Sequence, residues 1–397
     1  MLDKIKKLAE GHKHQIAEWR HEFHANPELS FQEFETTKRI KKYLEQMGFT
    51  NVRVGTGGIE TGVVADLDTQ KDGPCIALRA DIDALPMQEV GTPPYRSKND
   101  GVMHACGHDS HIAMLLGAAY VLKTMESELP GKVRFIFQPS EESPHKSGAR
   151  AMIQDGVLDG VDAISGLHIW SSLPAGVVGY KAGPFMASAD EWECIVWGKG
   201  GHGAVPHLAF DPIVAASAMV GALQTIVSRE IDPLEAVVIT CAHIESGTTF
   251  NIIPDKAFMQ GTVRTFNQEV RATIPERMER IIKGISEAMR CKSEFTYKHV
   301  LPPTVNDKEF TEKAADVARA LLGADNVKEV VPTMGAEDMS LYLERVPGTF
   351  MFLGTYNESK GTVNPQHHPE YDVDDDVLPF GSALLASIAW SFLNKQM

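Results

Sequence analysis

Short apolar runs alternate with helical patterns through the first part of the sequence. The runs are bounded by Gly, Pro or Asp, as buried strands usually are, and they cover residues 61–66, 75–79 and 133–137. Stretches with apolar residues at helical spacing cover residues 2–25, 30–47 and 110–125. Strands that alternate with helices at these distances predict an α/β layer architecture with a largely parallel sheet.

The pattern changes after Gly179 and predicts a second domain. Strand, helix, strand, strand, helix and strand patterns follow one another at residues 191–197, 211–229, 236–243, 256–266, 268–289 and 294–299. This is the order of the split βαβ, or ferredoxin-like, domain. A chain of 397 residues also exceeds the size at which one core usually stops growing. We expect this domain at 183–296, inserted between the two parts of a main domain at 1–182 and 297–397.

Charge and composition exclude several classes of protein. The 53 acidic and 38 basic residues give a net charge of −15, which repels nucleic acid and anionic membrane surfaces. No stretch approaches the roughly 18 uninterrupted apolar residues of a membrane span, and the N-terminus lacks the apolar core of a secretory signal. The five cysteines are scattered and do not resemble a disulfide framework. We expect a cytoplasmic protein without nucleic-acid or membrane partners.

Two short motifs carry groups that could bind a metal ion. Cys106 and His108 lie two residues apart, and Gly107 between them allows the backbone to turn so that both can face one site. Glu141 and Glu142 follow the strand pattern 133–137, at the end of a strand where open α/β sheets place their ligands. Beside a metal ion, one carboxylate can bind the ion while the other takes a proton from water. Either motif alone also fits an ordinary surface loop.

Two further strand-end or loop positions offer histidines, at His168 and at the pair His367 and His368. Five ligands of mixed softness suit zinc, manganese or cobalt; they are Cys106, His108, Glu142, His168 and His367. Five ligands exceed one tetrahedral site, but two ions about 3.5–4 Å apart would accommodate them. The sequence therefore predicts a dinuclear site of the kind used for hydrolysis.

These motifs resemble those of the dinuclear metallopeptidase superfamily of aminoacylases and glutamate carboxypeptidases. The most similar branch contains hippurate hydrolase, the indole-acetyl-amino-acid hydrolases and bacterial N-acyl-amino-acid amidohydrolases, and the resemblance runs from about Trp19 to Trp390. Its motifs in this sequence are residues 78–86, 106–109, 141–142, 166–168 and His367, two residues before Pro369. The resemblance implies a mixed-sheet α/β catalytic domain with an inserted ferredoxin-like lid or dimerisation domain.

The resemblance also implies roles for individual residues. The five ligands named above would hold two divalent ions (Zn, Mn, Co or Ni), with His368 as the alternative to His367, and Glu141 would be the general base. Most of the superfamily has a histidine ligand where this sequence has Asp81, so we place Asp81 and Asp83 around the ligands as orienting groups. The segment 143–148 after the paired glutamates is slightly longer and more polar than the turn usual in the family, which is consistent with a solvated turn or with a loop that faces the substrate.

In the inserted domain, the resemblance assigns His202 to the active site of a partner subunit in a homodimer, and Asn251 and Arg264 to substrate binding. Arg264 can grip a carboxylate through two hydrogen bonds. Residues 198–203 fit the G-x-G-x-x-G pattern of dinucleotide-binding proteins. However, Pro206 delays the helix, and the next strand does not end in the required acid, so we expect no nicotinamide cofactor.

The expected activity is hydrolysis of the amide bond in an N-acyl amino acid, with an acetyl, benzoyl or similar acyl group. The products are a carboxylic acid and a free amino acid. The alternative is a metallo-carboxypeptidase or dipeptidase that acts on short peptides, because the same metal centre cuts both kinds of amide. A metal-dependent binding protein without turnover would need the ligands but not Glu141 beside them.

Overall fold

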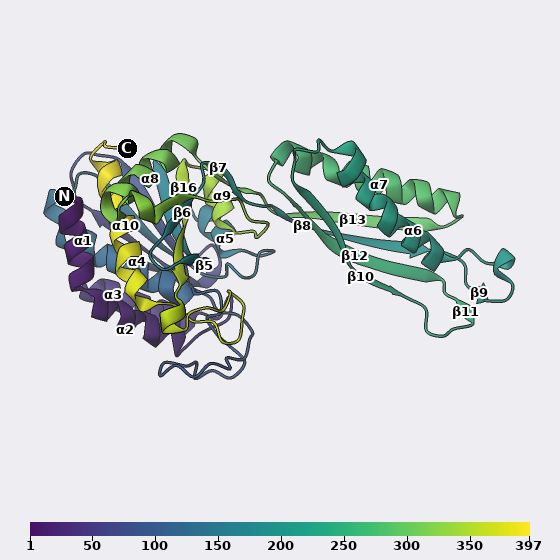
Figure 1. Ribbon diagram of the computed structural model, residues 1–397, viewed down its shortest axis with the longest axis horizontal. Coiled ribbons are helices and arrows are strands. Elements are labelled where there is room, and N and C mark those ends of the chain that lie inside the picture. Colours follow the sequence, from purple (N-terminus) through teal and green to yellow (C-terminus); the bar gives the residue numbers. More distant parts are fainter. The chain divides into compact units, whose positions relative to one another are not determined.

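The computed structural model describes residues 1–397, apart from the side chain of Thr56. The chain folds into two compact units (Figure 1). The main unit comprises Met1–Gly183, Val305–Val331 and Asp338–Met397, and the inserted unit comprises Pro184–Thr304 and Pro332–Glu337. The boundary that we expected after residue 296 falls inside strand β13, which continues to Leu301, and the inserted unit extends to Thr304. Two short strands lie at the boundaries, β7 (Gly183–Met186) and β14 (Thr304–Asn306).

An eight-stranded mixed sheet forms the centre of the main unit. Its order is β1-β2-β4-β3-β5-β16-β6-β15. In chain order the strands are β1 (Val52–Thr56), β2 (Ile59–Asp68), β3 (Cys75–Asp81), β4 (Lys132–Gln138), β5 (Ala163–Pro174), β6 (Val178–Tyr180), β15 (Val327–Glu329) and β16 (Gly348–Tyr356). Strand β3 is parallel to β4 and β5, and β16 is parallel to β5, whereas β1 and β2 add an antiparallel edge. The carboxyl ends of the central strands therefore meet at one edge of the sheet.

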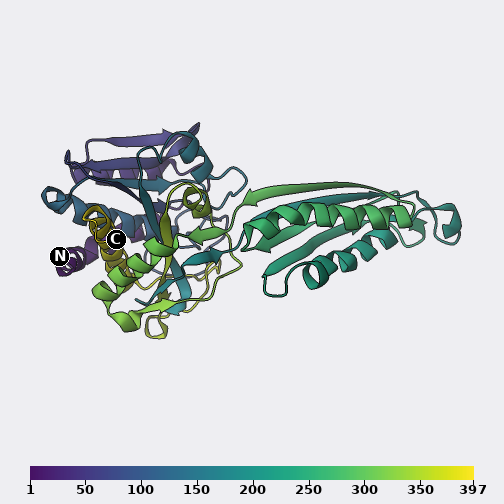
Figure 2. The same cartoon turned by 90° about the horizontal axis from the view of Figure 1, so that it is seen from above.

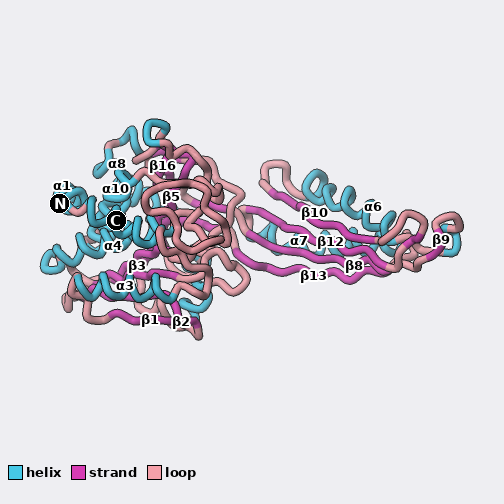
Figure 3. Tube along the Cα trace, turned by 90° about the horizontal axis from the view of Figure 1, so that it is seen from below, coloured by secondary structure: helices cyan, strands magenta, loops and turns pink.

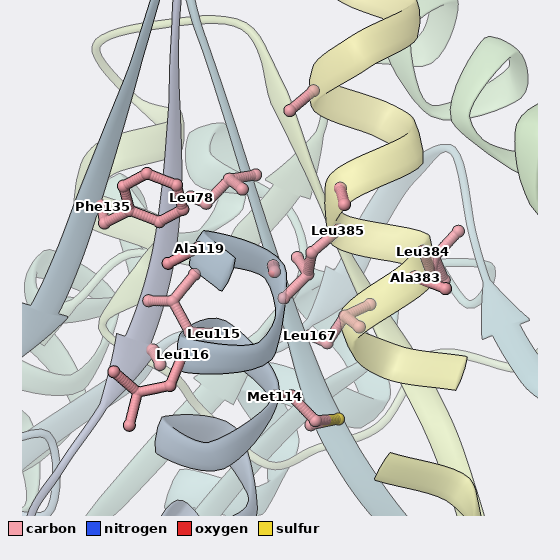
Figure 4. Packing of buried hydrophobic residues seen from close by; sticks show 14 of the residues in the cluster. Leu78, Met114, Leu115, Leu116, Ala119, Phe135, Leu167, Ala383, Leu384 and Leu385 are labelled. Carbon is pink, nitrogen blue, oxygen red and sulfur yellow. The ribbon is translucent and has the colours of Figure 1, made fainter. Parts of the chain in front are cut away.

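Helices cover both faces of this sheet (Figure 2). They are α1 (Leu2–Gly11), α2 (Lys13–His24), α3 (Phe34–Gln46), α4 (His108–Thr124), α5 (Gly148–Gln154), α8 (Lys308–Leu322), α9 (Met339–Leu343) and α10 (Leu378–Leu393). Helices α4 and α10 are apolar around most of their circumference, as buried helices are, and they pack against each other in the core. In Figure 4, Leu115 of α4 and Leu385 of α10 lie beside Leu78 and Leu167 of the sheet.

The inserted unit has the predicted ferredoxin-like order. Its strands β8 (Ala189–Trp197), β10 (Val237–Ser246), β12 (Lys256–Thr265) and β13 (Lys292–Leu301) form an antiparallel sheet in the order β10-β12-β8-β13. Figure 3 shows these strands running along the length of the unit. Helices α6 (Pro212–Thr225) and α7 (Gln268–Ala288) pack on one face of the sheet. A short pair, β9 (Gly201–His202) and β11 (Ile252–Ile253), lies at one end of the sheet, which we call the tip.

Two helical segments, Pro212–Glu230 and Asp375–Leu393, are long and apolar enough to cross a membrane by length and composition alone. The second contains α10, and 78% of it is buried inside the protein. The first contains α6, and 33% of that segment is buried. Core packing accounts for the apolar composition of the second segment, whereas the first exposes the apolar side chains of Ile213 and Val214.

Candidate metal and catalytic site

Asp81 and Asp83 lie buried at and just beyond the carboxyl end of β3. Asp83 accepts hydrogen bonds from the backbone N–H groups of Glu141 (3.1 Å) and Glu142 (3.0 Å). Asp81 accepts one from the Arg79 guanidinium at 2.9 Å. Burial opposes ionisation of Asp81, but His108, His111 and Arg79 hold its pKa well below the usual range. Asp83 thus holds the backbone of the paired glutamates, and Asp81 pairs with Arg79.

Gly107 makes the turn between Cys106 and helix α4, which begins at His108. Its φ is +86°, in the left-handed region that side chains disfavour. A Cβ there would also lie 2.1 Å from Cδ1 of Ile169. The position therefore requires glycine, and the turn it makes brings the thiol and the first ring of α4 to the same side.

The histidine rings are oriented by backbone carbonyl groups. Nδ1 of His108 donates to the carbonyl of Asp83 at 2.9 Å, and Nδ1 of His168 donates to the carbonyl of Ile169 at 2.6 Å. These bonds place the proton on Nδ1 and leave a lone pair on Nε2 of each ring, and neutral histidines of proteins bind metal ions through such a lone pair. Nε2 of His168 lies 3.5 Å from Sγ of Cys106.

The residues present fit a cation. Nε2 of His108 and Oε1 of Glu142 are buried, lie 4.0 Å apart and have no hydrogen-bond partner among the described residues. Unsatisfied buried polar atoms of this kind are costly unless an ion or water binds them. Five groups of side chains have ligand atoms within 4.8 Å of one another, and three of them contain only the predicted ligands and Glu141; they are Cys106–His108–His168, Cys106–Glu142–His367 and His108–Glu141–Glu142. The structure thus brings together all five predicted ligands and Glu141.

The two adjacent histidines of the C-terminal loop differ in their surroundings. His367 has a φ of +64°, and its N–H donates to the carbonyl of Ala105 at 2.8 Å. Its Nε2 lies 3.6 Å from Oε1 of Glu142. In contrast, Nδ1 of His368 accepts the backbone N–H of Glu370. Of the two rings, only that of His367 belongs to a described ligand group.

The pKa values of the cluster show how its side chains would respond to a bound cation. Burial and the neighbouring Glu142 raise the pKa of the Cys106 thiol. The neighbouring Cys106 and Glu142 raise the pKa of His367 to about 10. A thiol, a carboxylate and three imidazoles held this close favour a bound cation, because a cation stabilises the thiolate and the carboxylate together.

His111 is a residue of the site that the sequence analysis missed. It lies one helical turn after His108 on α4 and is buried. Its Nδ1 hydrogen-bonds Asp81, and its Nε2 accepts the N–H of Ile169 at 2.9 Å. Both ring nitrogens are therefore engaged, and His111 ties α4 to the strand that carries His168. The spacing of three residues from His108 was the available signal, since residues three apart share a helix face.

A buried ionic network lies behind the first ligand motif. Asp109, the residue after His108, accepts hydrogen bonds from Nε of Arg20 (3.1 Å) and Nδ1 of His24 (2.8 Å). Nε2 of His24 lies 3.2 Å from the carboxylate of Glu89. All four side chains are almost fully buried. The network fixes the first turn of α4 to helix α2.

The His24 imidazole should stabilise the folded chain more at pH 6 than at pH 10. Burial opposes its protonation, but hydrogen bonds to Asp109 and Glu89 raise the pKa of His24 to about 9. The pKa of an unfolded histidine is about 6.5. The stabilisation is therefore complete below pH ~6.5 and is lost as the pH rises through about 9. Melting temperatures of the wild type and His24→Gln should converge toward alkaline pH; a gap that stayed constant would contradict this assignment.

The three predicted residues of the inserted unit lie in two places. His202 and Asn251 are exposed at the tip, where the carbonyl of Asn251 accepts the N–H of Gly203. Nδ1 of His202 accepts the N–H of Ala204 at 3.1 Å, which leaves Nε2 available. Arg264 is half-buried near the far end of β12, paired with Val238. Its guanidinium has no hydrogen-bond or ion-pair partner among the described residues, so it is available for an anion.

An α/β unit that gathers this ligand set at its strand ends, with an inserted ferredoxin-like unit, defines a metal-dependent hydrolase. The chain belongs to peptidase family M20/M25/M40, whose model matches residues 77–391. It is similar to N-acetylcysteine deacetylase of Bacillus subtilis, with 44% identity over 93% of this chain and 94% of the relative. It is also 42% identical to thermostable carboxypeptidase 2 of Saccharolobus solfataricus, over 99% of this chain and all of the relative.

A solved structure has the same fold over nearly the whole chain. The YXEP protein of Bacillus subtilis, a dinuclear metal binding peptidase of the M20 family, aligns with a TM-score of 0.85 and 39% identity. The alignment covers 97% of this chain and 99% of that protein. The resemblance and the fold class inferred from the sequence are thus confirmed. The chain is a metal-dependent amide hydrolase of this family.

Proposed function

We propose that the chain hydrolyses N-acyl amino acids at a dinuclear metal site held by Cys106, His108, Glu142, His168 and His367. The observation that carries this proposal is the cluster of unsatisfied ligand atoms with Glu141 beside it. The similarity to a deacetylase that acts on an N-acetyl amino acid supports the substrate class. The ligand set of imidazole, thiolate and carboxylate suits Zn, Mn, Co or Ni.

In this mechanism Glu141 is the general base. Its carboxylate accepts a proton from the attacking water and returns it to the departing amine. Bound ions would supply Lewis-acid activation of the water and of the scissile carbonyl. The backbone of Glu141 is fixed by Asp83, so the carboxylate can be held ready beside His108 and Glu142.

We assign the substrate carboxylate to Arg264. A free guanidinium presents donors in a planar fork that matches a carboxylate. Burial lowers the pKa of Arg264, although Asp190 and Glu191 act against that shift. A half-buried cation without a partner gains more from binding an anion than a fully solvated one does. Asn251 is assigned to substrate binding by the same resemblance that assigns His202.

We further propose that His202 serves the active site of a second subunit in a homodimer. His202 lies at the tip, beside the start of β12, and Arg264 lies near the end of that strand. Strand β12 has 10 residues and is therefore roughly 30 Å long at ~3.3 Å per residue. One small substrate cannot reach both residues of the same chain, so a site that uses both needs two chains.

The inserted unit also offers a surface for such a dimer. Strand β10 is an edge strand of the sheet, with Val238 and Ile244 exposed. Helix α6 exposes Ile213 and Val214. Unpaired edges and exposed apolar groups favour association with another chain.

A cytoplasmic location remains our expectation from the composition.

A substrate panel tests the proposed activity. After reconstitution with Zn, Mn, Co or Ni, we expect the highest kcat/KM on N-acetyl or N-benzoyl amino acids. Methyl esters of the same substrates should bind poorly, because they lack the carboxylate for Arg264. The similarity to thermostable carboxypeptidase 2 supports short peptides as the alternative substrates. Higher kcat/KM on dipeptides than on every acyl amino acid would favour that alternative over ours.

A further inference from the structure

A carboxyl group that the proposed chemistry does not use lies buried beneath the catalytic turn. Glu33, just before helix α3, has an exposed fraction of 0%. Its Oε1 accepts hydrogen bonds from the backbone N–H of Ser140 (2.8 Å) and from the Ser140 hydroxyl (3.1 Å). Its Oε2 accepts the hydroxyl of Thr61 at 2.8 Å. The side chain thus spans from strand β2 to the residue before Glu141.

Ser140 needs this support because its backbone is in the left-handed region. Its φ is +57°, a conformation that is unfavourable for a residue with a Cβ. Besides the two bonds to Glu33, its hydroxyl accepts the N–H of Phe31 (2.8 Å) and its carbonyl accepts the N–H of Gly148 (3.2 Å). Each polar group of Ser140 therefore has a hydrogen-bond partner. Together these bonds stabilise a backbone conformation that is otherwise unfavourable.

The left-handed turn at Ser140 directs the next two N–H groups toward Asp83. Glu141 and Glu142 donate to its two carboxylate oxygens, and the hydroxyl of Ser30 also donates to Asp83 at 2.6 Å. The segment 30–33 therefore holds the turn both through Ser140 and through Asp83. A relaxation of Ser140 would rotate the peptide units that set the directions of the Glu141 and Glu142 side chains.

We propose that Glu33 is a positioning residue for catalysis, which acts by locking Ser140 so that Glu141 is presented to its substrate water. This inference rests on the proposed role of Glu141 as the base. Burial and the nearby charge of Asp83 raise the pKa of Glu33 to about 7. A buried carboxyl group costs stability that an apolar residue would not, and such groups are commonly functional.

Glu33→Asp tests the proposal with little risk to folding. Glu33 is the N-cap residue of α3 without a side-chain capping bond, and Asp is a favoured N-cap. The shorter side chain keeps the carboxyl group but withdraws it from Ser140. We expect kcat to fall by about 10- to 100-fold, with KM, metal content and melting temperature near the wild type. Glu33→Gln retains the reach and an acceptor oxygen and should restore most of kcat.

Glu28→Ala is the matched control. The Glu28 carboxylate accepts N–H groups of Glu35 and Thr36 in the same helix, and no bond from its side chain to Ser140 is described. We expect Glu28→Ala to lower the melting temperature without lowering kcat. Equal kcat losses in Glu28→Ala and Glu33→Asp would overturn the proposal in favour of a general effect on α3. A loss of bound metal in proportion to the loss of kcat would also overturn the proposal, because Glu33 would then act by retaining the metal.

A double-mutant cycle separates this inference from the proposed base. If Glu33 acts through Glu141, then Glu33→Asp should cost little further activity in a Glu141→Gln background. Independent, multiplicative losses would overturn the proposal while leaving Glu141 as the base. Normal kcat in Glu33→Asp alone would also refute only this inference. Normal kcat in Glu141→Gln would instead refute the proposed function.

Discussion

Glu141→Gln is expected to lower kcat by at least ~10²-fold while the chain retains its metal ions. Gln keeps the size and most hydrogen bonds of Glu but cannot accept the proton of the attacking water. The backbone N–H of Glu141 would still donate to Asp83, so the turn should keep its shape. Steady-state kinetics, with elemental analysis of the same preparation, give kcat and metal content together.

Glu142→Gln is the matched comparison, because it alters the neighbouring carboxylate on the same turn. Oε1 of Glu142 lies within 4.0 Å of both His108 and His367, in the centre of the ligand cluster. This variant should therefore lose metal along with activity, and added metal should restore part of it. Near-normal turnover in Glu141→Gln, or equal metal loss in both variants, would remove Glu141 from the role of base.

His202→Ala is expected to lower kcat by about 10²–10³-fold without loss of metal. The imidazole at the tip has a free Nε2 that can donate to the oxyanion formed when water attacks the carbonyl. Removal of one such donor typically has an effect of this size. His207→Ala is a suitable control, because His207 is an exposed histidine of the same tip region and should tolerate substitution.

Mixing His202→Ala with Glu141→Gln tests whether the site is shared between subunits. In a heterodimer, the chain with intact Glu141 receives intact His202 from its partner, so one of two sites is complete. Random exchange makes about half of all dimers heterodimers, and the mixture should reach about a quarter of wild-type activity. Two nearly inactive proteins would then recover activity together.

Two outcomes would contradict a site shared between subunits. If tagged and purified heterodimers showed no recovery, His202 would not act in the partner's site. A monomer with full turnover, identified by light scattering at the assay concentration, would contradict the dimer as well. In either case at least one of His202 and Arg264 would not contact the substrate, because the two residues lie near opposite ends of β12, which is roughly 30 Å long.

Several features of the site could be predicted from local sequence. Gly107 between Cys106 and His108 indicated a turn, and the structure places it at a φ of +86°. The paired glutamates were expected at a strand end, and they follow β4. The ferredoxin-like order of the inserted unit was also predictable, because apolar periodicity distinguishes helices from strands over segments of this length.

Other features depend on contacts between distant parts of the chain. The sequence left His367 and His368 as alternatives, and the hydrogen bond from His367 to Ala105 distinguishes their positions. The sheet was expected to be largely parallel, but β1 and β2 add an antiparallel edge. The network of Glu33 with Ser140 joins residues 107 positions apart and has no local signature.

The sequence by itself therefore determined the residue types of the site, the turns that carry them and the class of the inserted unit. These follow from short-range physics, since backbone preferences and side-chain periodicity act over a few residues. Only the tertiary structure decided which nitrogen of each histidine is free, which histidine of the pair lies in the cluster and how Glu141 is held. Those properties depend on hydrogen-bond partners and burial, which exist only once strands and helices far apart in the chain have packed together.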